Sequence, residues 1–168
     1  MQECKKTIGV YSGTFDPFTK GHMDIVKRSL KIYDMVIIAV AISSAKKPMF
    51  TIKQRIRFIQ KALKGYKNIQ VVQFSNLLVD FVQDNGTYNI IRGIRNIQDF
   101  EYELNMSYAN VSLNSKINTA FFTPKLKHQF ISSSLVRELL RFDGDIKHLV
   151  PKQIFDNIHK KYKKNLKG

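Results

Sequence analysis

The most informative stretch of the chain reads Ile8-Gly9-Val10-Tyr11-Ser12-Gly13-Thr14-Phe15-Asp16-Pro17-Phe18-Thr19-Lys20-Gly21-His22. Its first four residues form an apolar run that predicts a buried strand, and a helical pattern follows the glycine turn. The first turn of a helix leaves backbone N–H groups unpaired and carries a partial positive charge, so phosphate groups bind there. Gly21 permits the close approach of a ligand, and His22 adds one directed hydrogen-bond donor. The stretch therefore predicts a phosphate-binding site between a strand and a helix.

Short apolar runs alternate with helical patterns along the rest of the chain. We predict strands at residues 7–11, 34–42, 69–74, 88–91 and 119–123, and helices at 51–63, 99–113, 133–142 and 152–162. Continuous apolar strands separated by helices predict a doubly wound, Rossmann-like α/β fold, a five-stranded parallel sheet with helices on both faces. We expect one domain, 1–168, with a solvated, lysine-rich tail from about residue 159.

The composition excludes several classes of protein and site. Cys4 is the only cysteine, which rules out an intramolecular disulfide and a cysteine-built zinc site. The longest apolar run, residues 35–42, is too short to span a bilayer, and the N-terminus has no apolar core of the kind found in signal peptides. We therefore expect a cytoplasmic protein with no membrane partner.

The formal net charge of +15 points toward nucleic-acid binding. The 21 lysines outnumber the 7 arginines, however, and they are scattered rather than set on one stripe. The one dense cluster, residues 159–164, lies at the end of the chain, where lysine runs are usually solvated. We predict no specific nucleic-acid partner, and a basic nucleic-acid-binding protein is the alternative from a different class.

Polar residues gather where four of the predicted strands end, in the segments 13–16, 43–47, 92–95 and 128–134. In a doubly wound fold the ligand lies beyond the carboxyl ends of the strands, so these loops should converge on one edge of the sheet. We expect Lys46 to contact phosphate there and Lys47 to be solvated. An arginine at the end of an apolar strand, such as Arg92, is costly to bury without an anion.

Asp99 and Glu103 lie one turn apart on the predicted helix that follows residues 92–95. They could orient the two arginines of that segment or hold ribose hydroxyls. The alternative is a salt-bridge network among the four charged groups, which we weigh lower because such networks do not require Arg-Gly-x-Arg at a strand end. Residues 132–134 are serines at another helix start, where N-capping alone would explain them. Beside the other three loops, they favour a second phosphate contact.

The motifs of several enzyme classes are missing from the sequence. It contains no Walker-type glycine–lysine loop, no Gly-x-Ser-x-Gly elbow and no His-Glu-x-x-His, and no residue stands out as a covalent nucleophile. A helix start disfavours imidazolium, so His22 is expected to act as a neutral hydrogen-bond donor. A site of histidine, lysine, arginine and helix N-termini suits phosphoryl or nucleotidyl transfer directly between two substrates.

Two motifs resemble those of a known superfamily. Residues 13–22, in their T-x-G-H form, and residues 131–134, Ile-Ser-Ser-Ser, are similar to the two signatures of the nucleotidylyltransferases. Several subfamilies share these two signatures, and three further segments indicate which one the chain resembles. The segments 46–50, 91–95 and 99–103 resemble those of the bacterial phosphopantetheine adenylyltransferases. That resemblance implies adenylyl transfer from ATP to 4′-phosphopantetheine, giving dephospho-coenzyme A and pyrophosphate in the penultimate step of coenzyme A synthesis. It also implies Mg²⁺ and no covalent enzyme intermediate.

The resemblance, which runs from about residue 8 to residue 151, implies roles for individual residues. His22 would stabilise the charge that develops at the α-phosphate of ATP. The residues implied on the phosphopantetheine side are Thr14, Lys46, Leu78 and Arg92, of which Thr14, Lys46 and Arg92 are grouped with His22 as catalytic. The residues implied on the ATP side are Thr14, Phe15, His22, Gly93, Ile94, Arg95, Glu103, His128, Gln129, Phe130, Ile131, Ser132, Ser133 and Ser134. Mg²⁺ would be held mainly by the ATP phosphates, without a metal site in the protein.

The same resemblance implies a homohexamer and feedback inhibition by coenzyme A. Tyr102, Met106 and Tyr108 could supply an interface or be buried within one subunit. Two positions depart from the family pattern, since Ser12 stands where proline is common and His128 where tryptophan is common near the nucleotide. The nearest alternative is another nucleotidylyltransferase, for nicotinate mononucleotide or for CTP, whose pattern lacks the arginine–glycine motif and the acidic run after it.

Overall fold

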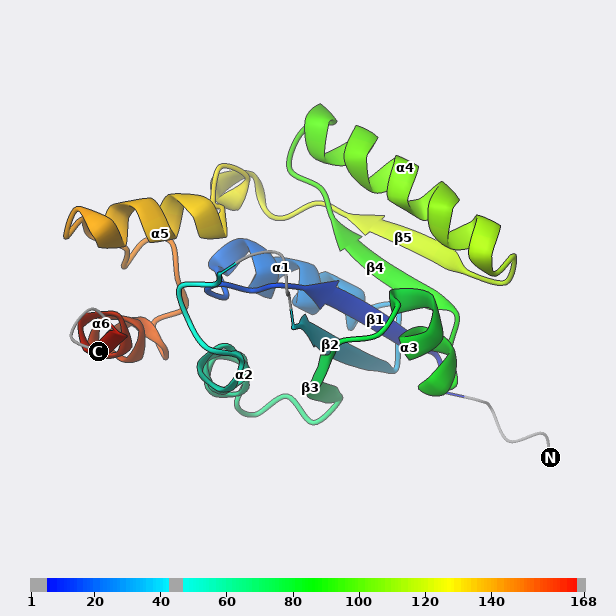
Figure 1. The fold of residues 1–168 in the computed structure, drawn as a ribbon, viewed down its shortest axis with the longest axis horizontal. Helices are drawn as coiled ribbons and strands as arrows, with labels where there is room; N and C mark the ends of the chain where they lie inside the picture. The colour runs from blue at the N-terminus through cyan, green and yellow to red at the C-terminus, as the bar shows by residue number, and fades with distance from the viewer. Residues whose placement is uncertain (1–5, 43–46, 166–168) are drawn as a thin grey trace.

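The strands of the protein form one five-stranded parallel sheet (Figure 1). The structure is a computed structural model that describes residues 6–42 and 47–165. The strands are β1 (Ile8–Gly13), β2 (Met35–Ala41), β3 (Ile69–Phe74), β4 (Asn89–Gly93) and β5 (Asn118–Phe122). Their order across the sheet is β3-β2-β1-β4-β5, and every pairing is parallel. The predicted doubly wound α/β fold is confirmed.

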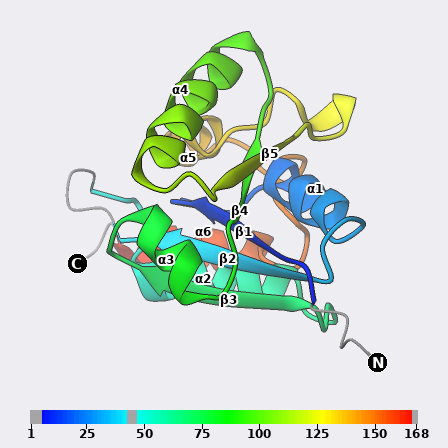
Figure 2. The same cartoon turned by 90° about the vertical axis from the view of Figure 1, so that its right-hand side faces the viewer.

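Helices cover both faces of the sheet. They are α1 (Lys20–Ser29), α2 (Ile52–Ala62), α3 (Leu78–Asp84), α4 (Ile97–Leu113), α5 (Ser133–Arg141) and α6 (Phe155–Asn165), with a short 3₁₀ turn at Leu126–His128. Figure 2 shows α3 and α4 on one side of the sheet and α1 on the other. Val26 of α1 and Ile59 of α2 share a core with Tyr11, whereas Val79 of α3 packs with Val10. Neighbouring residues of β1 thus enter opposite cores, as strand alternation requires. Within the described ranges, no helix is long and apolar enough to cross a bilayer.

Every predicted strand and helix is present, with ends within about three residues of the prediction, the usual scatter of boundaries. Both β1 and β4 run on to a glycine, Gly13 and Gly93. Thr51 and Gln54 form a reciprocal capping box that begins α2. Helix α3 was not predicted, because a seven-residue helix is too short to show a helical period.

The lysine-rich segment 159–165 is helical, which corrects the prediction of a solvated tail from about residue 159. Helix α6 continues to Asn165, and Ile158 and Tyr162 on its inner face are buried. Asn165 Nδ2 donates to the Met49 carbonyl oxygen at 3.0 Å, so the end of α6 packs on the segment before α2. The helix predicted at 152–162 already contained Ile158 and Tyr162, whose i, i+4 spacing places them on one face, so the error lies in expecting the lysines from about residue 159 to form a solvated tail.

One face of α4 is left uncovered by the described part of the chain. Phe100 and Val111 on this helix are exposed. Tyr102, Met106 and Tyr108 are exposed as well. Burial of these three side chains within one subunit is therefore excluded, and the interface is the reading that stays open.

Candidate active site

A cavity of about 320 Å³ opens at the carboxyl ends of β1 and β4. The starts of α1 and α5 complete its wall, so the predicted convergence of loops on one edge of the sheet is observed for three of the four segments. The predicted site residues that line it are Thr14, Phe15, His22, Arg92, Gly93, Arg95, Glu103, Ile131, Ser132, Ser133 and Ser134. Lys46 and most of its segment lie outside the described residues.

The start of α1 fixes the orientation of His22. Thr19 is the N-cap residue: its Oγ1 accepts from the His22 backbone N–H at 3.3 Å, and its own N–H donates to His22 Nδ1 at 3.0 Å. The arrangement is a capping box in which histidine replaces the usual glutamate or glutamine. Nδ1 accepts a hydrogen bond only when it carries no proton, so the neutral ring is protonated on Nε2. Nε2 is therefore the ring nitrogen that can donate to a ligand.

Burial keeps the His22 imidazole neutral. Desolvation, followed by the positive charge of Arg95, lowers the pKa of His22 from 6.5 to about 3. The ring packs against Phe15 and Phe18, whose centroids lie 5.1 and 5.6 Å from its own. Burial also raises the pKa of the Tyr11 phenol in the same wall of the cavity. The sequence predicted a neutral imidazole from the helix dipole, and in the structure burial and the charge of Arg95 lower the pKa of the ring.

Two ion pairs hold the arginines at the end of β4. Arg92 Nε lies 3.0 Å from Glu103 Oε2, and Arg92 Nη1 donates to the Ser12 carbonyl oxygen at 3.1 Å. Arg95 makes a two-point contact with Asp99, at 2.8 and 3.0 Å. The alternative of salt bridges among the four charged groups is therefore present, as two ion pairs. It does not exclude a binding role, because all four charged residues line the cavity.

Glu103 has an environment that suits an arginine partner. Burial raises the pKa of the Glu103 carboxyl, and the positive charge of Arg92 opposes that effect. A half-buried carboxylate beside a guanidinium fixes the guanidinium plane before any ligand binds.

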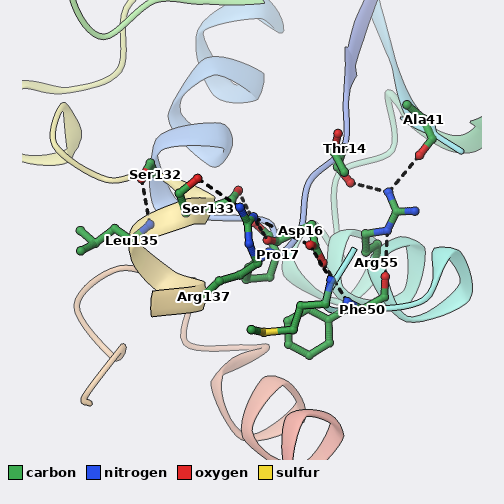
Figure 3. A network of polar contacts seen from close by, with 12 residues as sticks. Thr14, Asp16, Pro17, Ala41, Phe50, Arg55, Ser132, Ser133, Leu135 and Arg137 are labelled. Carbon is green, nitrogen blue, oxygen red and sulfur yellow. Dashed lines mark hydrogen bonds and ion pairs between the residues drawn. The ribbon is translucent and has the colours of Figure 1, made fainter. Parts of the chain in front are cut away.

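Ser132, Ser133 and Ser134 form the turn that begins α5, called here the serine turn, which combines helix capping with contacts to the β1–α1 loop. Ser132 Oγ accepts from the Leu135 N–H at 3.0 Å, which is an N-cap interaction. Ser133 Oγ donates to the Pro17 carbonyl oxygen at 2.9 Å (Figure 3). N-capping thus accounts for the Ser132 hydroxyl, and the turn as a whole also forms a wall of the cavity.

His128, which the resemblance placed on the ATP side, is tied to α1 and does not line the cavity. Its Nδ1 lies 2.6 Å from Asp24 Oδ2, and the same carboxylate oxygen accepts from the Lys125 N–H at 3.1 Å. Asp24 is buried, so it anchors the 3₁₀ turn that leads to the serine turn. Nothing in the local sequence indicates this pairing, since the two residues lie 104 positions apart.

Four other predicted site residues also lie outside the wall of this cavity in the described part of the chain. Leu78 begins α3 and packs into the core beneath that helix. The Ile94 N–H donates to the Phe122 carbonyl oxygen at 2.8 Å, which continues the β4–β5 ladder. Gln129 and Phe130 are exposed next to the serine turn, Phe130 to 59%.

Two buried charged residues beside the cavity were missed. The Asp16 carboxylate accepts the backbone N–H groups of Met49 and Phe50 at 2.8 and 2.9 Å. Arg55 donates to backbone carbonyl oxygens of three separate segments (Figure 3). The available signal for Arg55 was an arginine within the apolar stripe of the helix predicted at residues 51–63.

The chain matches known proteins along most of its length. The model of the cytidylyltransferase-like family matches residues 10–139. A phosphopantetheine adenylyltransferase from Helicobacter hepaticus is 48% identical, over 97% of this chain and 99% of that protein. One from Campylobacter curvus is 51% identical, over 87% of this chain and 94% of that protein. The chain belongs to the phosphopantetheine adenylyltransferase family. The family resemblance seen in the sequence is confirmed.

A solved structure shares the fold of this member of the phosphopantetheine adenylyltransferase family. A crystal structure of a candidate nicotinate-nucleotide adenylyltransferase from Vibrio parahaemolyticus aligns with a TM-score of 0.72 over 94% of each chain. The two sequences are 16% identical, so the likeness shows the fold alone. The fold is thus common to proteins named for different acceptors, and the acceptor must be inferred from the family and the cavity.

Proposed function

We propose that the protein transfers the adenylyl group of ATP to 4′-phosphopantetheine and releases dephospho-coenzyme A and pyrophosphate. Relatives at about half identity over most of the chain carry the name of this activity, which supports the reaction. The observation in the molecule that carries the proposal is one cavity in which a neutral His22 lies with Arg92, Arg95 and the serine turn. Such a set of donors suits phosphate groups that react directly with one another.

The proposed step is a direct in-line displacement. A terminal phosphate oxygen of phosphopantetheine attacks the α-phosphorus of ATP, and the bond from that phosphorus to the bridging oxygen breaks, so its electron pair leaves with pyrophosphate. His22 Nε2–H donates a hydrogen bond to the α-phosphate oxygen on which charge develops. Because the imidazole is neutral over a wide range of pH, this donor needs no proton transfer to act.

On the acceptor side, we assign Thr14, Lys46 and Arg92 to hold and orient the attacking phosphate. Glu103 fixes Arg92 before the substrate binds, which reduces the entropy lost on binding. Arg92 comes two residues after Ile90, a member of the core under α3, so strand alternation supports a place for Arg92 on that face of the sheet. Leu78 begins α3 on the same face, which supports a contact between its backbone and the pantetheine arm.

On the ATP side, we assign the residues that the resemblance implied: Phe15, Gly93, Ile94, Arg95, Glu103 and the stretch 128–134. Gly93 has a spatial reason to be glycine, because an added Cβ would lie 3.1 Å from Ile25 Cγ1 and 3.4 Å from the Tyr11 hydroxyl. A side chain there would crowd the wall of the cavity. For His128 the assignment is limited to its backbone, since Asp24 holds the ring.

Mg²⁺ is part of the proposal as an ion that arrives on the ATP phosphates. Within the described ranges, no group of three or more His, Cys, Asp or Glu side chains could hold a metal ion. The cavity carboxylates Asp99 and Glu103 are each paired with an arginine. These residues fit a metal that keeps phosphate oxygens and water as its ligands. When bound, Mg²⁺ would neutralise phosphate charge and favour departure of pyrophosphate.

The proposal extends to assembly, regulation and location. The uncovered face of α4, with Tyr102 and Tyr108 exposed to 65% and 64%, supports contact with further copies in a homohexamer. Coenzyme A contains the whole of the dephospho-coenzyme A product, so we propose that it competes for the same cavity as a feedback inhibitor. A cytoplasmic location is part of the same proposal, because the reaction draws on ATP.

The test is pyrophosphate release with Mg²⁺ and ATP, with 4′-phosphopantetheine, nicotinate mononucleotide or glycerol 3-phosphate in parallel reactions and CTP as a control nucleotide. We expect pyrophosphate release with ATP and phosphopantetheine, and none with any other pair of nucleotide and acceptor. Release with a different acceptor would keep the nucleotidylyltransferase chemistry and overturn the substrate. No release from folded protein, together with tight and salt-sensitive binding to DNA or RNA, would favour a basic nucleic-acid-binding protein.

A further inference from the structure

Arg55 is a buried cation that touches none of the cavity but holds the segments that build it. It lies on α2 and is 2% exposed. Its Nη1 donates to the Thr14 carbonyl oxygen at 2.6 Å and to the Ala41 carbonyl oxygen at 3.0 Å, and its Nε donates to the Phe50 carbonyl oxygen at 3.1 Å (Figure 3). The guanidinium thus joins the end of β1, the end of β2 and the start of α2.

A merely structural role does not explain an arginine at this position. Removing a guanidinium from water is costly, and apolar residues of similar volume often replace buried ionic groups without loss of stability. The hydrogen bonds from Arg55 go to three backbone carbonyl oxygens. The negative charge of Asp16 acts on Arg55 without a direct ion pair between the two in the described part of the chain. A planar group with several donors in a fixed fork is suited to hold separate chain segments at set distances. The side chain at this position is therefore explained by the fixed arrangement of its hydrogen-bond donors and not by the space that it fills.

The segment that Arg55 holds is conformationally unfavourable. Phe15, directly after Thr14, has a φ of 50°, in the left-handed region. Side chains other than glycine adopt that region at a cost of roughly 1–2 kcal/mol. The turn is needed because Thr14 and Phe15 both line the cavity, and the Phe15 ring packs edge-on against His22. The hydrogen bond from Arg55 acts on the peptide immediately before this residue.

The other side of the same loop is held by α5. Arg137 Nη1 donates to the Asp16 carbonyl oxygen at 2.7 Å, and Ser133 Oγ donates to the Pro17 carbonyl oxygen. These contacts come from the helix on the ATP side of the cavity, whereas those of Arg55 reach Thr14, Ala41 and Phe50. The two arginines thus act on different ends of the loop, and the effects of Arg55 should fall on the acceptor side.

We propose that Arg55 is a positioning residue for the acceptor phosphate, which it serves by fixing the Thr14 peptide relative to the ends of β1 and β2. The inference rests on the proposed function, because it uses the assignment of Thr14 to the attacking phosphate. Displacing a reacting group by about 1 Å costs on the order of a hundredfold in rate. A loosened Thr14 should therefore affect the acceptor and leave ATP binding unchanged.

The test compares Arg55→Met, which keeps volume and removes every donor, with Arg57→Met on the exposed face of the same helix. Pyrophosphate release gives kcat and the KM for phosphopantetheine, and calorimetric titration gives the Kd for ATP. For Arg55→Met we expect kcat/KM for phosphopantetheine to fall by about tenfold to a hundredfold, with the Kd for ATP within twofold of wild type. Arg57→Met should match wild type in both.

Two further variants keep the inference testable if Arg55→Met does not fold. Arg55→Lys retains a charged donor that can reach Thr14 and Ala41, so it should recover most of the acceptor kcat/KM. Arg55→Ala leaves a space into which added guanidinium can bind, and guanidinium should raise its acceptor kcat/KM without changing its Kd for ATP. Equal losses for both substrates in the variants that fold, or unchanged use of phosphopantetheine, would overturn the inference. Failure of the proposed function would differ, because wild-type protein itself would then release no pyrophosphate with phosphopantetheine.

Discussion

Replacing His22 with asparagine separates the two tasks that the structure gives this side chain. Asparagine Oδ1 can take the place of Nδ1 as acceptor for the Thr19 N–H, but the Nε2–H donor is lost. Loss of one preorganised donor to a developing oxyanion lowers kcat by about 10² to 10³, or roughly 2.7 to 4 kcal/mol. His22→Gln carries an amide donor farther from the backbone, near the former Nε2, and should recover part of that loss.

The assay is initial-rate pyrophosphate release at saturating ATP and phosphopantetheine, with circular dichroism as the check on folding. The KM values should change less than kcat, because the bond from Nε2–H is proposed to strengthen only as charge develops. A folded His22→Asn protein with wild-type kcat would refute the proposed role of the imidazole. Equal kcat values for the asparagine and glutamine variants would refute the assignment to the Nε2 position.

Wild type and His22→Asn also test, through their stability, whether the fold keeps the His22 imidazole neutral. The pKa of His22 is lowered by folding, from 6.5 to about 3, so the unfolded chain binds its proton first as the pH falls. The stabilising contribution is complete above pH 6.5 and is lost as the pH falls toward 3. Linkage gives a loss of about 2 kcal/mol at pH 5 from this residue, which His22→Asn cannot show.

Urea unfolding near pH 7 and near pH 5, at one protein concentration, measures this difference. Other titrating groups are shared by wild type and variant and cancel when the two pH effects are subtracted. Wild type should lose more stability than His22→Asn on acidification. The same loss in both proteins would show that the imidazole is not held neutral by the fold.

Four further predictions concern the fold, the acceptor site and the metal. Ile158→Ala should lower the free energy of unfolding by about 2–5 kcal/mol, because its side chain is fully buried; a change near zero in urea unfolding would return α6 to a solvated tail. Ser12→Ala should raise that free energy by about 1 kcal/mol, because the Ser12 hydroxyl is buried without a hydrogen-bond partner in the described part of the chain; a loss of stability would reveal a partner. Glu103→Gln should lower kcat/KM for phosphopantetheine by about fivefold, because Arg92 loses an ion pair worth about 1 kcal/mol. EDTA should abolish pyrophosphate release and leave the circular dichroism spectrum unchanged, and activity in EDTA would remove Mg²⁺ from the proposal.

Much of the architecture was predictable because it depends on local patterns. Strands with continuous apolar runs and helices with a 3.6-residue period are encoded within ten or so neighbouring residues, which is why β2 was placed to within one residue at each end. The misses have the same explanation. Helix α3 has seven residues, too few for a period, and α6 continues beyond the predicted end at Tyr162 through two lysines and an asparagine, which carry no apolar pattern.

The candidate site was predictable to the extent that parallel topology brings strand ends to one edge. That rule sufficed to group Thr14, His22, Arg92 and the serine turn, all of which line the cavity. It could not indicate where the ring of His128 lies, because that ring forms a hydrogen bond with Asp24 on α1, a residue distant in the sequence. It also could not decide whether Arg92 and Glu103 bind a ligand or form a salt bridge with each other. In the structure the two residues form an ion pair and both line the cavity.

The sequence by itself determined the order of elements, the edge of the sheet that carries the chemistry and the family to which the chain belongs. These follow from periodicity and from short motifs such as residues 13–22, whose meaning is local. Only the tertiary structure decided which charged groups are buried and what they hold. Arg55 and Thr14 lie 41 positions apart, and their contact exists because β1, β2 and α2 pack together. Whether a buried charge binds a ligand or positions the residue that does depends on that packing, which no local pattern contains.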